Sequence, residues 1–368
     1  MKIGIILHPF GEKHPGGLPR VIFGWAENLI RFAPENSFII YLKEECKQMP
    51  ILPDGNVEFH VLGGGRFWMD KLASAPKSDV YLFNTPVLPF FTKLKGAIVI
   101  AQDFPYKYLP ARSIKEFFKR KFVEWYHSRS FRRAAHIIAI SDYTKKDVIR
   151  FFGIPESKVT TIYPDYKRIC DIFLPDPVPL PERFFFFAAT IKERKNVFTI
   201  VRAFIKLLDR RPDLNHHLVL GGKAEGPYYE SIMKFIRENK REDRIQFLGH
   251  LTERQLSYIY PKADALVFPS IVEGTGLPVL EAMSCGTPVI TSDICGPSEL
   301  GAEGSAILVH PEDSDEMSEA MEQIATDDNL RQELSFSGKK RSDLFSWDKI
   351  PDHLPVKKFL AIAEKIVG

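Results

Sequence analysis

The sequence predicts an α/β protein made of two Rossmann-like domains, each built on a parallel sheet. Short apolar runs alternate with longer amphipathic segments along most of the 368 residues, a pattern typical of strands joined by helices in parallel sheets. A chain of this length is expected to form two domains. Near the middle, prolines at alternate positions mark a stiff linker; they are Pro175, Pro177, Pro179 and Pro181.

The composition is that of an ordinary soluble globular protein. It is 45% hydrophobic and 26% charged with a net charge of +3, a balance that does not indicate nucleic acid. The four cysteines (46, 170, 285 and 295) lack the short paired spacing of zinc or redox sites, so we expect a reducing cytoplasm. The apolar run in MKIGIILHPFG is too short for a secretory signal, and no segment approaches the length of a membrane span. We therefore expect a cytoplasmic protein whose membrane association, where it occurs, is peripheral.

Six apolar runs in the first half are predicted strands. They are Ile3–Leu7, Phe38–Leu42, Val57–Val61, Val80–Phe83, Ala97–Ala101 and Ala135–Ile140. Gly16 and Gly17 lie between the first strand and the predicted helix Leu18–Phe32, where glycines let the backbone approach a ligand; a plain flexible loop is the alternative. Neither a GxGxxG nor a GxxxxGK[ST] motif is present. Gln102 and Asp103 follow a strand at the edge where such sheets bind ligands, although Asp103 is also suited to cap the next turn.

Residues 106–136 combine basic and aromatic side chains at roughly helical spacing. The basic residues are Arg112, Lys115, Lys119, Arg120, Lys121, Arg129, Arg132 and Arg133, and the aromatic residues are Phe117, Phe118, Phe122, Trp125 and Tyr126. One interpretation is a basic amphipathic helix that touches anionic lipid. We favour the other, a helix with an aromatic core face and a solvated basic face. No nucleic-acid-binding motif accompanies the segment. Further along, Ser141 is the predicted N-cap of a helix that ends at Gly153.

The second half repeats the alternation after the prolines. Its predicted strands are Phe184–Ala189, Leu218–Leu220, Ile245–Leu248, Asp264–Phe268, Thr287–Thr291 and Ile307–Val309. Arg194 and Lys195 lie in a turn between the first of these strands and a helix from about Asn196 to Leu208, on the side of the sheet where an anion would bind. His250 follows the third strand, and a ligand contact and an ordinary exposed histidine explain it equally well. Glu312–Phe345 is predicted to form two helices.

The segment Phe268–Pro297 is predicted to form a strand, a turn, a short helix Leu277–Ser284 and a second strand. Gly286 follows the helix, where a residue with positive φ is expected. Backbone N–H groups at the helix start, from Thr275, Gly276 and Leu277, form a site suited to a phosphate. Glu273 and Glu281 bracket this site. The alternative is that the glycines only punctuate the helix and both glutamates are solvated.

The stretch EGTGLPVLE, from Glu273 to Glu281, resembles the Glu-x7-Glu signature of retaining GT-B glycosyltransferases of family 4. The continuation AMSCGTPVITSD fits as well, although Thr275 stands where an aromatic residue is common. Three further stretches resemble the family: ISDYTKKDVIRFFGIPESKVTTIYP, ATIKERKNVFTIVRAF and FSWDKI. The resemblance covers most of the chain and is strongest over residues 186–300.

The resemblance implies roles for these residues. Lys195, and next Arg194, would hold the diphosphate of a nucleotide sugar, Glu273 would contact the sugar and Glu281 the ribose. The other donor-binding residues implied are Thr275, Gly276, Leu277, Gly16, Gly17, Gln102, Asp103 and His250. Gln102 stands where many members have histidine, so it implies sugar contact only. Asp313 and Asp315 have the DxD spacing of metal-dependent glycosyltransferases, but N-capping of a helix explains them better, and we assign no metal.

The resemblance also implies the architecture and the reaction. Two domains, 1–174 and 175–349, would face each other across a cleft, with about 350–368 crossing back to the first. The enzyme would transfer a hexose, with mannose from GDP-mannose as the first candidate, to a glycan or lipid-linked acceptor. It would retain the anomeric configuration and need no metal or cofactor. The alternatives are a GT-B sugar-nucleotide epimerase and a non-catalytic GT-B scaffold subunit, which the intact Glu273, Glu281 and Lys195 disfavour.

Overall fold

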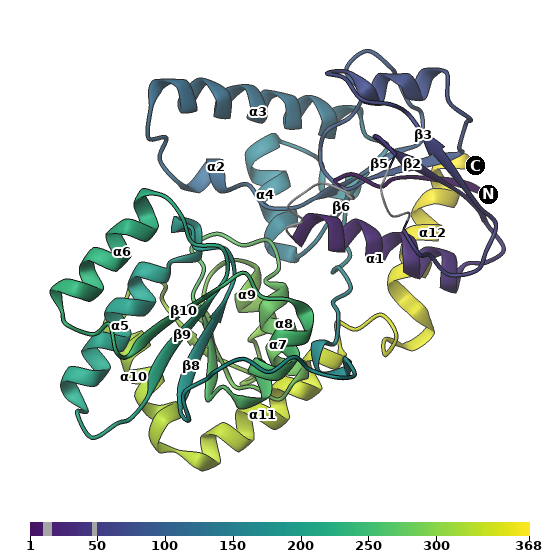
Figure 1. Cartoon of the computed structure of the whole chain (residues 1–368). Coiled ribbons are helices and arrows are strands. Elements are labelled where there is room, and N and C mark those ends of the chain that lie inside the picture. The colour runs from purple at the N-terminus through teal and green to yellow at the C-terminus, as the bar shows by residue number, and fades with distance from the viewer. Residues whose placement is uncertain (10–16, 46–49) are drawn as a thin grey trace. The chain divides into compact units, whose positions relative to one another are not determined.

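The computed structural model describes residues 1–9, 17–45 and 50–368, which form two compact units (Figure 1). The first unit contains Met1–Asp165 and Ser346–Gly368, and the second contains Tyr166–Phe345. Each unit is built on one parallel sheet. The predicted fold class, two parallel-sheet α/β domains, is therefore confirmed.

The first unit has a seven-stranded sheet in the order β3-β2-β1-β4-β5-β6-β7. The strands are β1 (Lys2–Ile6), β2 (Ser37–Leu42), β3 (Val57–Val61), β4 (Val80–Phe83), β5 (Ala97–Ala101), β6 (His136–Ala139) and β7 (Val159–Thr161). The central strands are continuous apolar runs because a parallel sheet is covered on both faces. The strand order changes direction between β1 and β4, and the carboxyl ends at such a point are where α/β sheets bind ligands.

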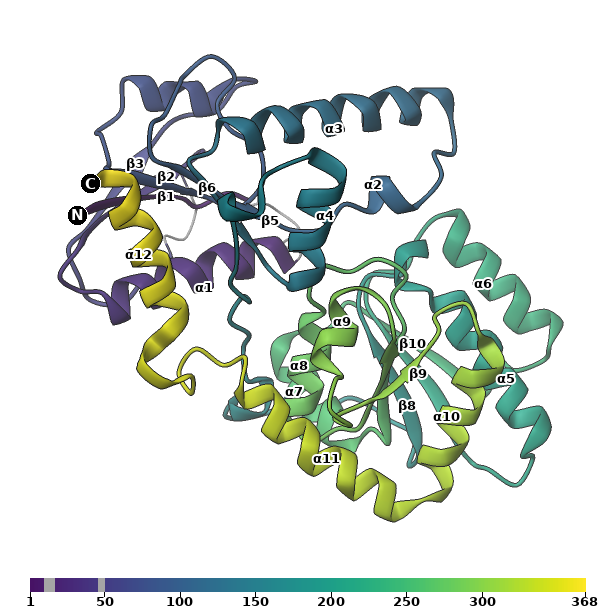
Figure 2. The same ribbon diagram turned by 180° about the vertical axis from the view of Figure 1, so that it is seen from behind.

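Helices complete the first unit. They are α1 (Gly17–Phe32), α2 (Pro105–Tyr108), α3 (Ile114–Arg133), α4 (Asp142–Phe152) and α12 (Leu354–Val367), with 3-10 turns at Trp68–Ala73, Glu156–Lys158 and Pro351–His353. The predicted caps of α4 are confirmed, since Ser141 accepts a hydrogen bond from the Thr144 N–H and Gly153 has a φ of 63°. Helix α12 returns to lie beside α1 (Figure 2). There the Trp25 ring packs 4.7 Å from that of Trp347.

The second unit has a six-stranded sheet in the order β10-β9-β8-β11-β12-β13. The strands are β8 (Phe184–Ala188), β9 (His217–Gly221), β10 (Ile245–Gly249), β11 (Ala265–Phe268), β12 (Val289–Ser292) and β13 (Ile307–Val309). The helices are α5 (Val197–Arg210), α6 (Pro227–Glu238), α7 (Glu253–Ile259), α8 (Leu277–Ser284), α9 (Cys295–Leu300), α10 (Ser314–Thr326) and α11 (Asp328–Asp343), with 3-10 turns at Ile169–Asp171, Glu193–Lys195 and Tyr260–Lys262. Strand β7 and helices α6, α7 and α9 are not among the elements predicted from the sequence.

The boundary between the units lies at Asp165, earlier than the expected residue 174. Asp165 belongs to the first unit because its carboxylate accepts hydrogen bonds from the Asn28 amide at 3.0 Å and the Trp347 N–H at 3.1 Å. The residues that follow belong to the second unit, where a disulfide joins Cys170 to Cys285 at the end of α8. This pair was not predicted from the sequence, because 115 residues separate its members. Cys46 lies outside the described residues.

The favoured interpretation of the basic aromatic segment is wrong. Phe117, Phe118, Phe122 and Trp125 of α3 are exposed, and the buried residues of this helix are Ser130 and Phe131. The aromatic residues therefore lie on the outside of the first unit and not in its core. Among the described residues, no helix combines the length and the apolar character needed to cross a membrane.

Candidate active site

Arg194, Lys195 and the turn 273–277 of the second unit lie at the carboxyl ends of two neighbouring strands, β8 and β11. The strand order changes direction between these strands, so their carboxyl ends mark the expected ligand position of an α/β sheet. The Glu193–Lys195 turn follows β8, and the turn that leads to α8 follows β11. Because the strands are parallel, both turns lie at the same edge of the sheet.

Three charged side chains meet at this edge. The Glu273 carboxylate accepts a hydrogen bond from the Arg194 guanidinium at 3.0 Å and another from the Lys195 ammonium. Lys195 Nζ also lies 4.6 Å from the centroid of the Phe268 ring, a cation–π distance. Burial raises the pKa of Glu273, but Lys195 and Arg194 outweigh it and hold this pKa below its ordinary value. The carboxylate is therefore ionised at neutral pH, between two cations.

Asn196 fixes the two turns against each other. It has a φ of 62°, and its buried side-chain amide donates to the carbonyl oxygens of Pro269 and Pro311. The Ile271 N–H donates to the Arg194 carbonyl at 2.9 Å. From the sequence, Asn196 was assigned no role beyond starting a helix. Its position directly after two basic residues and directly before the first residue of α5 is the signal that could have identified it.

The start of α8 is packed against the start of α9. Gly276 has a φ of 98°, and a Cβ atom there would lie 2.9 Å from Cγ of Pro297. The Gly296 N–H donates to the Glu273 carbonyl at 3.0 Å. Thr275 is buried, and α8 begins at Leu277. The turn therefore has little room to move, and it presents the first N–H groups of the helix in a fixed direction.

Glu281 lies one turn inside α8 and is buried. Its carboxylate accepts a hydrogen bond from the Tyr260 hydroxyl at 3.1 Å. The interpretation of Glu281 as an ordinary solvated glutamate is therefore wrong. Tyr260 is a supporting residue that the sequence analysis missed, since it lies on a different segment of the chain.

The remaining predicted residues lie elsewhere. Gln102 and Asp103 follow β5 in the first unit, where the Gln102 amide donates to the Asn84 carbonyl at 3.0 Å. Gly17 begins α1, and Gly16 lies outside the described residues. In the second unit, His250 follows β10 and is exposed. Within the second unit, His250 therefore lies at the end of a different strand from the cluster around Glu273.

Asp313 caps α10, as the sequence predicted. Its carboxylate accepts hydrogen bonds from the N–H groups of Asp315 at 2.9 Å and Glu316 at 3.0 Å, and these bonds lower the pKa of Asp313. Asp315 pairs with Lys206. Within the described part of the chain, no group of three or more histidine, cysteine or acidic side chains is placed to hold a metal.

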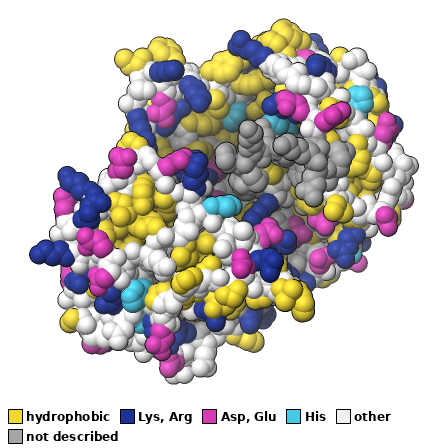
Figure 3. Space-filling model, viewed as in Figure 1, with side chains coloured by type: hydrophobic (Ala, Val, Ile, Leu, Met, Phe, Trp, Pro, Cys, Tyr) yellow, Lys and Arg dark blue, Asp and Glu magenta, His cyan; other side chains and the backbone are white. Residues whose placement is uncertain are grey.

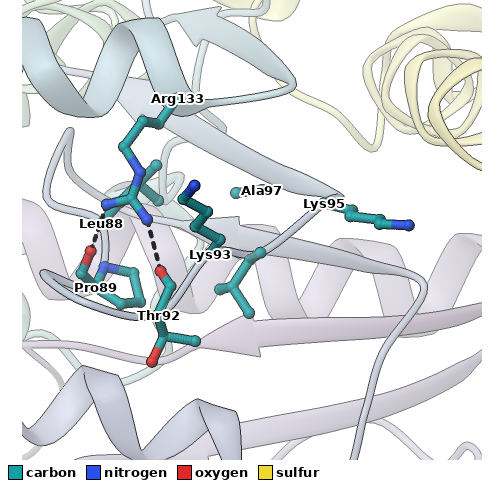
Figure 4. Close-up of a pocket in the computed structure, with 8 residues that line it drawn as sticks. Leu88, Pro89, Thr92, Lys93, Lys95, Ala97 and Arg133 are labelled. Atoms are coloured by element: carbon teal, nitrogen blue, oxygen red, sulfur yellow. Dashed lines mark hydrogen bonds between the residues drawn. The ribbon is translucent and has the colours of Figure 1, made fainter.

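Two other features were not among the predicted site residues. Burial raises the pKa of the Cys295 thiol to about 12, so this thiol is not a nucleophile at neutral pH. A pocket of about 300 Å³ lies in the first unit (Figure 4). It is lined by Leu88, Pro89, Thr92, Lys93, Leu94, Lys95, Ala97 and Arg133, and none of these was a predicted site residue.

Two family models match the chain. Residues 175–341 match "Glycosyl transferases group 1", and residues 69–164 match "Glycosyltransferase Family 4". The O-antigen chain mannosyltransferase B of Escherichia coli is 27% identical over 281 residues, which is 73% of this chain and 71% of that protein. The serotype-specific mannosyltransferase WbdA of Escherichia coli is 29% identical over 269 residues, but the matched region is 70% of this chain and only 32% of that protein.

Solved structures share the fold of the whole chain. Sucrose-phosphate synthase from Thermosynechococcus elongatus superposes with a TM-score of 0.74 and 19% identity, covering 99% of this chain and 98% of that one. HepE of Anabaena, in complex with UDP-glucose, superposes with a TM-score of 0.71 and 16% identity, covering 98% of this chain and 99% of that one. Both family models and the two parallel-sheet units lead to one conclusion: the chain is a GT-B glycosyltransferase of the group 1 and family 4 type.

Proposed function

We propose that this glycosyltransferase moves a hexose, with mannose as the first candidate, from a nucleoside diphosphate sugar to a hydroxyl group, with retention of the anomeric configuration. The acceptor would be a glycan or a lipid-linked glycan of polysaccharide assembly. The observation that carries the proposal is the cluster of Glu273, Lys195 and Arg194 at the carboxyl ends of β8 and β11. It combines two cations, which suit a diphosphate, with a carboxylate, which suits sugar hydroxyls.

The cluster would rearrange when a donor binds. Without a donor, Glu273 neutralises Lys195 and Arg194. The diphosphate brings negative charge, so it would take over both cations, assisted by the N–H groups at the start of α8. Glu273 would then be released towards the sugar. Because Lys195 is nearly buried, its attraction for a phosphate is screened little by water.

In the reaction, the bond from the anomeric carbon to the diphosphate oxygen breaks as the acceptor oxygen bonds to that carbon on the same face. The acceptor proton passes to the departing phosphate. The transition state resembles an oxocarbenium ion, with negative charge growing on the diphosphate. Lys195, Arg194 and the start of α8 would stabilise that charge. We assign no covalent nucleophile: Glu273 is assigned to the sugar hydroxyls, and the Cys295 thiol, whose pKa burial raises to about 12, stays protonated at neutral pH.

Relatives support the choice of sugar and acceptor. Two matched proteins from Escherichia coli are named mannosyltransferases, one of an O-antigen chain. GDP-mannose is therefore the first donor to test, and UDP-glucose, present in the HepE complex, is the second. We place the reaction in the cytoplasm, although disulfides such as Cys170–Cys285 are rare in that compartment. The redox state of this cysteine pair in cells therefore tests the placement.

A panel of nucleotide sugars tests the proposal. Thermal unfolding is followed with each donor in turn, and a donor at a hundred times its dissociation constant stabilises the protein by about 2.7 kcal/mol. The stabilising donor is then incubated with candidate acceptors, and NMR reads the anomeric configuration of the product. Inverted product would refute retention. Free sugar from donor alone, without any acceptor, would identify the epimerase alternative, and no stabilisation by any donor would favour a scaffold.

A further inference from the structure

Helix α3 and the loop 88–92, which lies between β4 and β5, carry a patch of exposed apolar side chains, here named the aromatic face. Its members are Ile114, Phe117, Phe118, Phe122 and Trp125 of α3 together with Phe91 of the loop 88–92. Their exposed fractions run from 49% at Phe117 to 78% at Ile114. Single exposed apolar side chains are common, whereas a contiguous patch marks a surface that binds something.

The aromatic face is continuous. Phe118 follows Ile114 by four residues, about one turn of helix, and Trp125 follows Phe118 by seven residues, about two turns. The three side chains therefore lie on one side of α3. The opposite side packs inward through Ser130 and Phe131. Ring contacts extend the face onto the loop, since the Phe90 ring lies 6.3 Å from Trp125 and 5.0 Å from Phe91.

The loop is fastened to α3 by its backbone. The Arg133 guanidinium donates to the carbonyl oxygens of Pro89 at 2.7 Å and Thr92 at 2.6 Å (Figure 4). The Tyr126 hydroxyl donates to the Leu88 carbonyl at 2.7 Å. These bonds fix Phe91 beside the helix before any partner arrives, so little conformational freedom remains to be lost on binding.

The charge beside the aromatic face is positive. Both carboxylates of α3 are held by cations of the protein, Glu116 by Arg120 and Glu124 by Lys107. The exposed lysines of the helix are Lys115, Lys119 and Lys121. In Figure 3 the upper edge of the molecule, over α3, shows hydrophobic side chains with lysine and arginine side chains among them.

We propose that the aromatic face docks the protein on an anionic lipid bilayer, with its rings at the level of the headgroups and its lysines against the lipid phosphates. Lysine is depleted in the cores of protein–protein interfaces, whereas a mixture of lysine, phenylalanine and tryptophan is typical of helices that lie in a membrane surface. The composition therefore favours lipid over a protein partner. This inference goes beyond the proposed reaction, because docking needs neither donor nor acceptor.

Trp125 is a built-in reporter for the test. The sequence contains four tryptophans. Trp25, Trp68 and Trp347 are buried, whereas Trp125 is 50% exposed. Insertion should shift its fluorescence to shorter wavelength and protect it from iodide. In Trp125→Phe this signal should disappear while flotation with vesicles persists.

The experiment is flotation with vesicles of equal parts phosphatidylcholine and phosphatidylglycerol, compared with phosphatidylcholine alone. Wild-type protein should float with the anionic vesicles and be released by salt. Ile114→Ser with Phe118→Ser should weaken partition by roughly tenfold or more. Lys115→Ala with Lys119→Ala should weaken it by about fivefold per lysine. Phe336→Ser and Lys340→Ala, on the exposed surface of α11, are matched controls and should bind as wild type.

Circular dichroism and thermal unfolding establish that every variant is folded, which is expected because the changed side chains are exposed. The proposal fails if wild-type protein does not float, if both α3 variants float as well as wild type, or if the α11 controls lose binding equally. A doubled mass in light scattering that the Ile114→Ser, Phe118→Ser variant abolishes, with no flotation, would assign the face to a second copy of the chain.

Discussion

Glu273 shares its carboxylate between Lys195 and Arg194, and the three side chains are nearly or partly buried. Removing one partner from such a group leaves the other charge without compensation, which costs more than the pair contributes. The donor diphosphate supplies replacement charge for both cations. Ligand binding and ion pairing therefore compete for the same groups, and single substitutions here should affect stability and binding together.

Lys195→Ala should weaken nucleoside diphosphate binding by roughly 1–3 kcal/mol, the scale of a charge-assisted hydrogen bond. Arg194→Ala should cost less, because Arg194 is more exposed than Lys195 and also donates to the Val272 carbonyl. Isothermal calorimetry measures both. Lys192→Ala is the matched control, since Lys192 is exposed in the same turn. Unchanged affinity in both test variants would remove the phosphate role.

Glu273→Gln should lower kcat, and Glu281→Gln should raise the donor KM. Contacts to the reacting sugar tighten as positive charge develops, whereas contacts to the ribose hold the donor equally in both states. Tyr260→Phe, which removes the hydrogen bond to Glu281, should resemble Glu281→Gln in a milder form. Steady-state kinetics decides between the roles, and the reverse pattern would exchange them.

At the scale of elements, Asp313 shows how a polar pair acts as a helix cap. Asp313→Ala should lower the midpoint of thermal unfolding, because α10 loses its N-cap, without changing turnover. Activity should also survive EDTA, because Asp313 is occupied by the N–H groups of Asp315 and Glu316. Loss of activity in EDTA that manganese restores would overturn the metal-independent reaction.

Helix α4 contains a buried carboxyl group that makes stability depend on pH. Burial raises the pKa of Asp147 to about 6 from 3.8, and Tyr108 donates a hydrogen bond to it. Between these values the folded protein keeps a proton that the unfolded chain releases, so this group lowers stability as pH rises through the window. Asp147→Asn should therefore stabilise by up to about 3 kcal/mol at pH 7 and little below the lower pKa. Urea unfolding at both pH values tests this; an equal gain at both would contradict it.

The elements were largely predictable from local pattern. Ala97–Ala101 and Leu277–Ser284 were predicted with the observed bounds. The first is a buried apolar run, and the second has a proline in its first turn and a glycine, Gly286, after its end. Both features can be read from the local sequence. Glu273 and Lys195 were identified from motifs, but not their ion pair. A contact between residues far apart in the sequence, 78 positions for Lys195 and Glu273, leaves no periodic signal. For the same reason the contacts of Tyr260 with Glu281 and of Cys170 with Cys285 were not predicted.

Helix α3 marks another limit of sequence reasoning. Spacing places Phe118 and Trp125 on one face, but spacing alone does not say whether that face meets the core or the solvent. That depends on what the fold puts beside it. Here Ser130 and Phe131 of the helix pack inward, so the aromatic face remains outside.

At the scale of the whole molecule, the Cys170–Cys285 bond links the start of the second unit to the end of α8. Cys285→Ser should reduce stability by about 2–4 kcal/mol when the bond is formed. Alkylation of unfolded protein from cells, read by mass spectrometry, should label Cys170 and Cys285 only after reduction. Labels on both before reduction would mean that the bond does not form in the compartment where the protein resides.

The return of α12 to α1 has a consequence for synthesis. Trp347 and Phe359 pack on Trp25, so the core of the first unit lacks part of its apolar cover until residues 347–359 have left the ribosome. All of the second unit, residues 166–345, is available earlier. Because domains generally fold as units, the unit that starts later in the sequence is free to finish first. During that interval the apolar side chains of α1 that this return later covers, Trp25 among them, are without that cover.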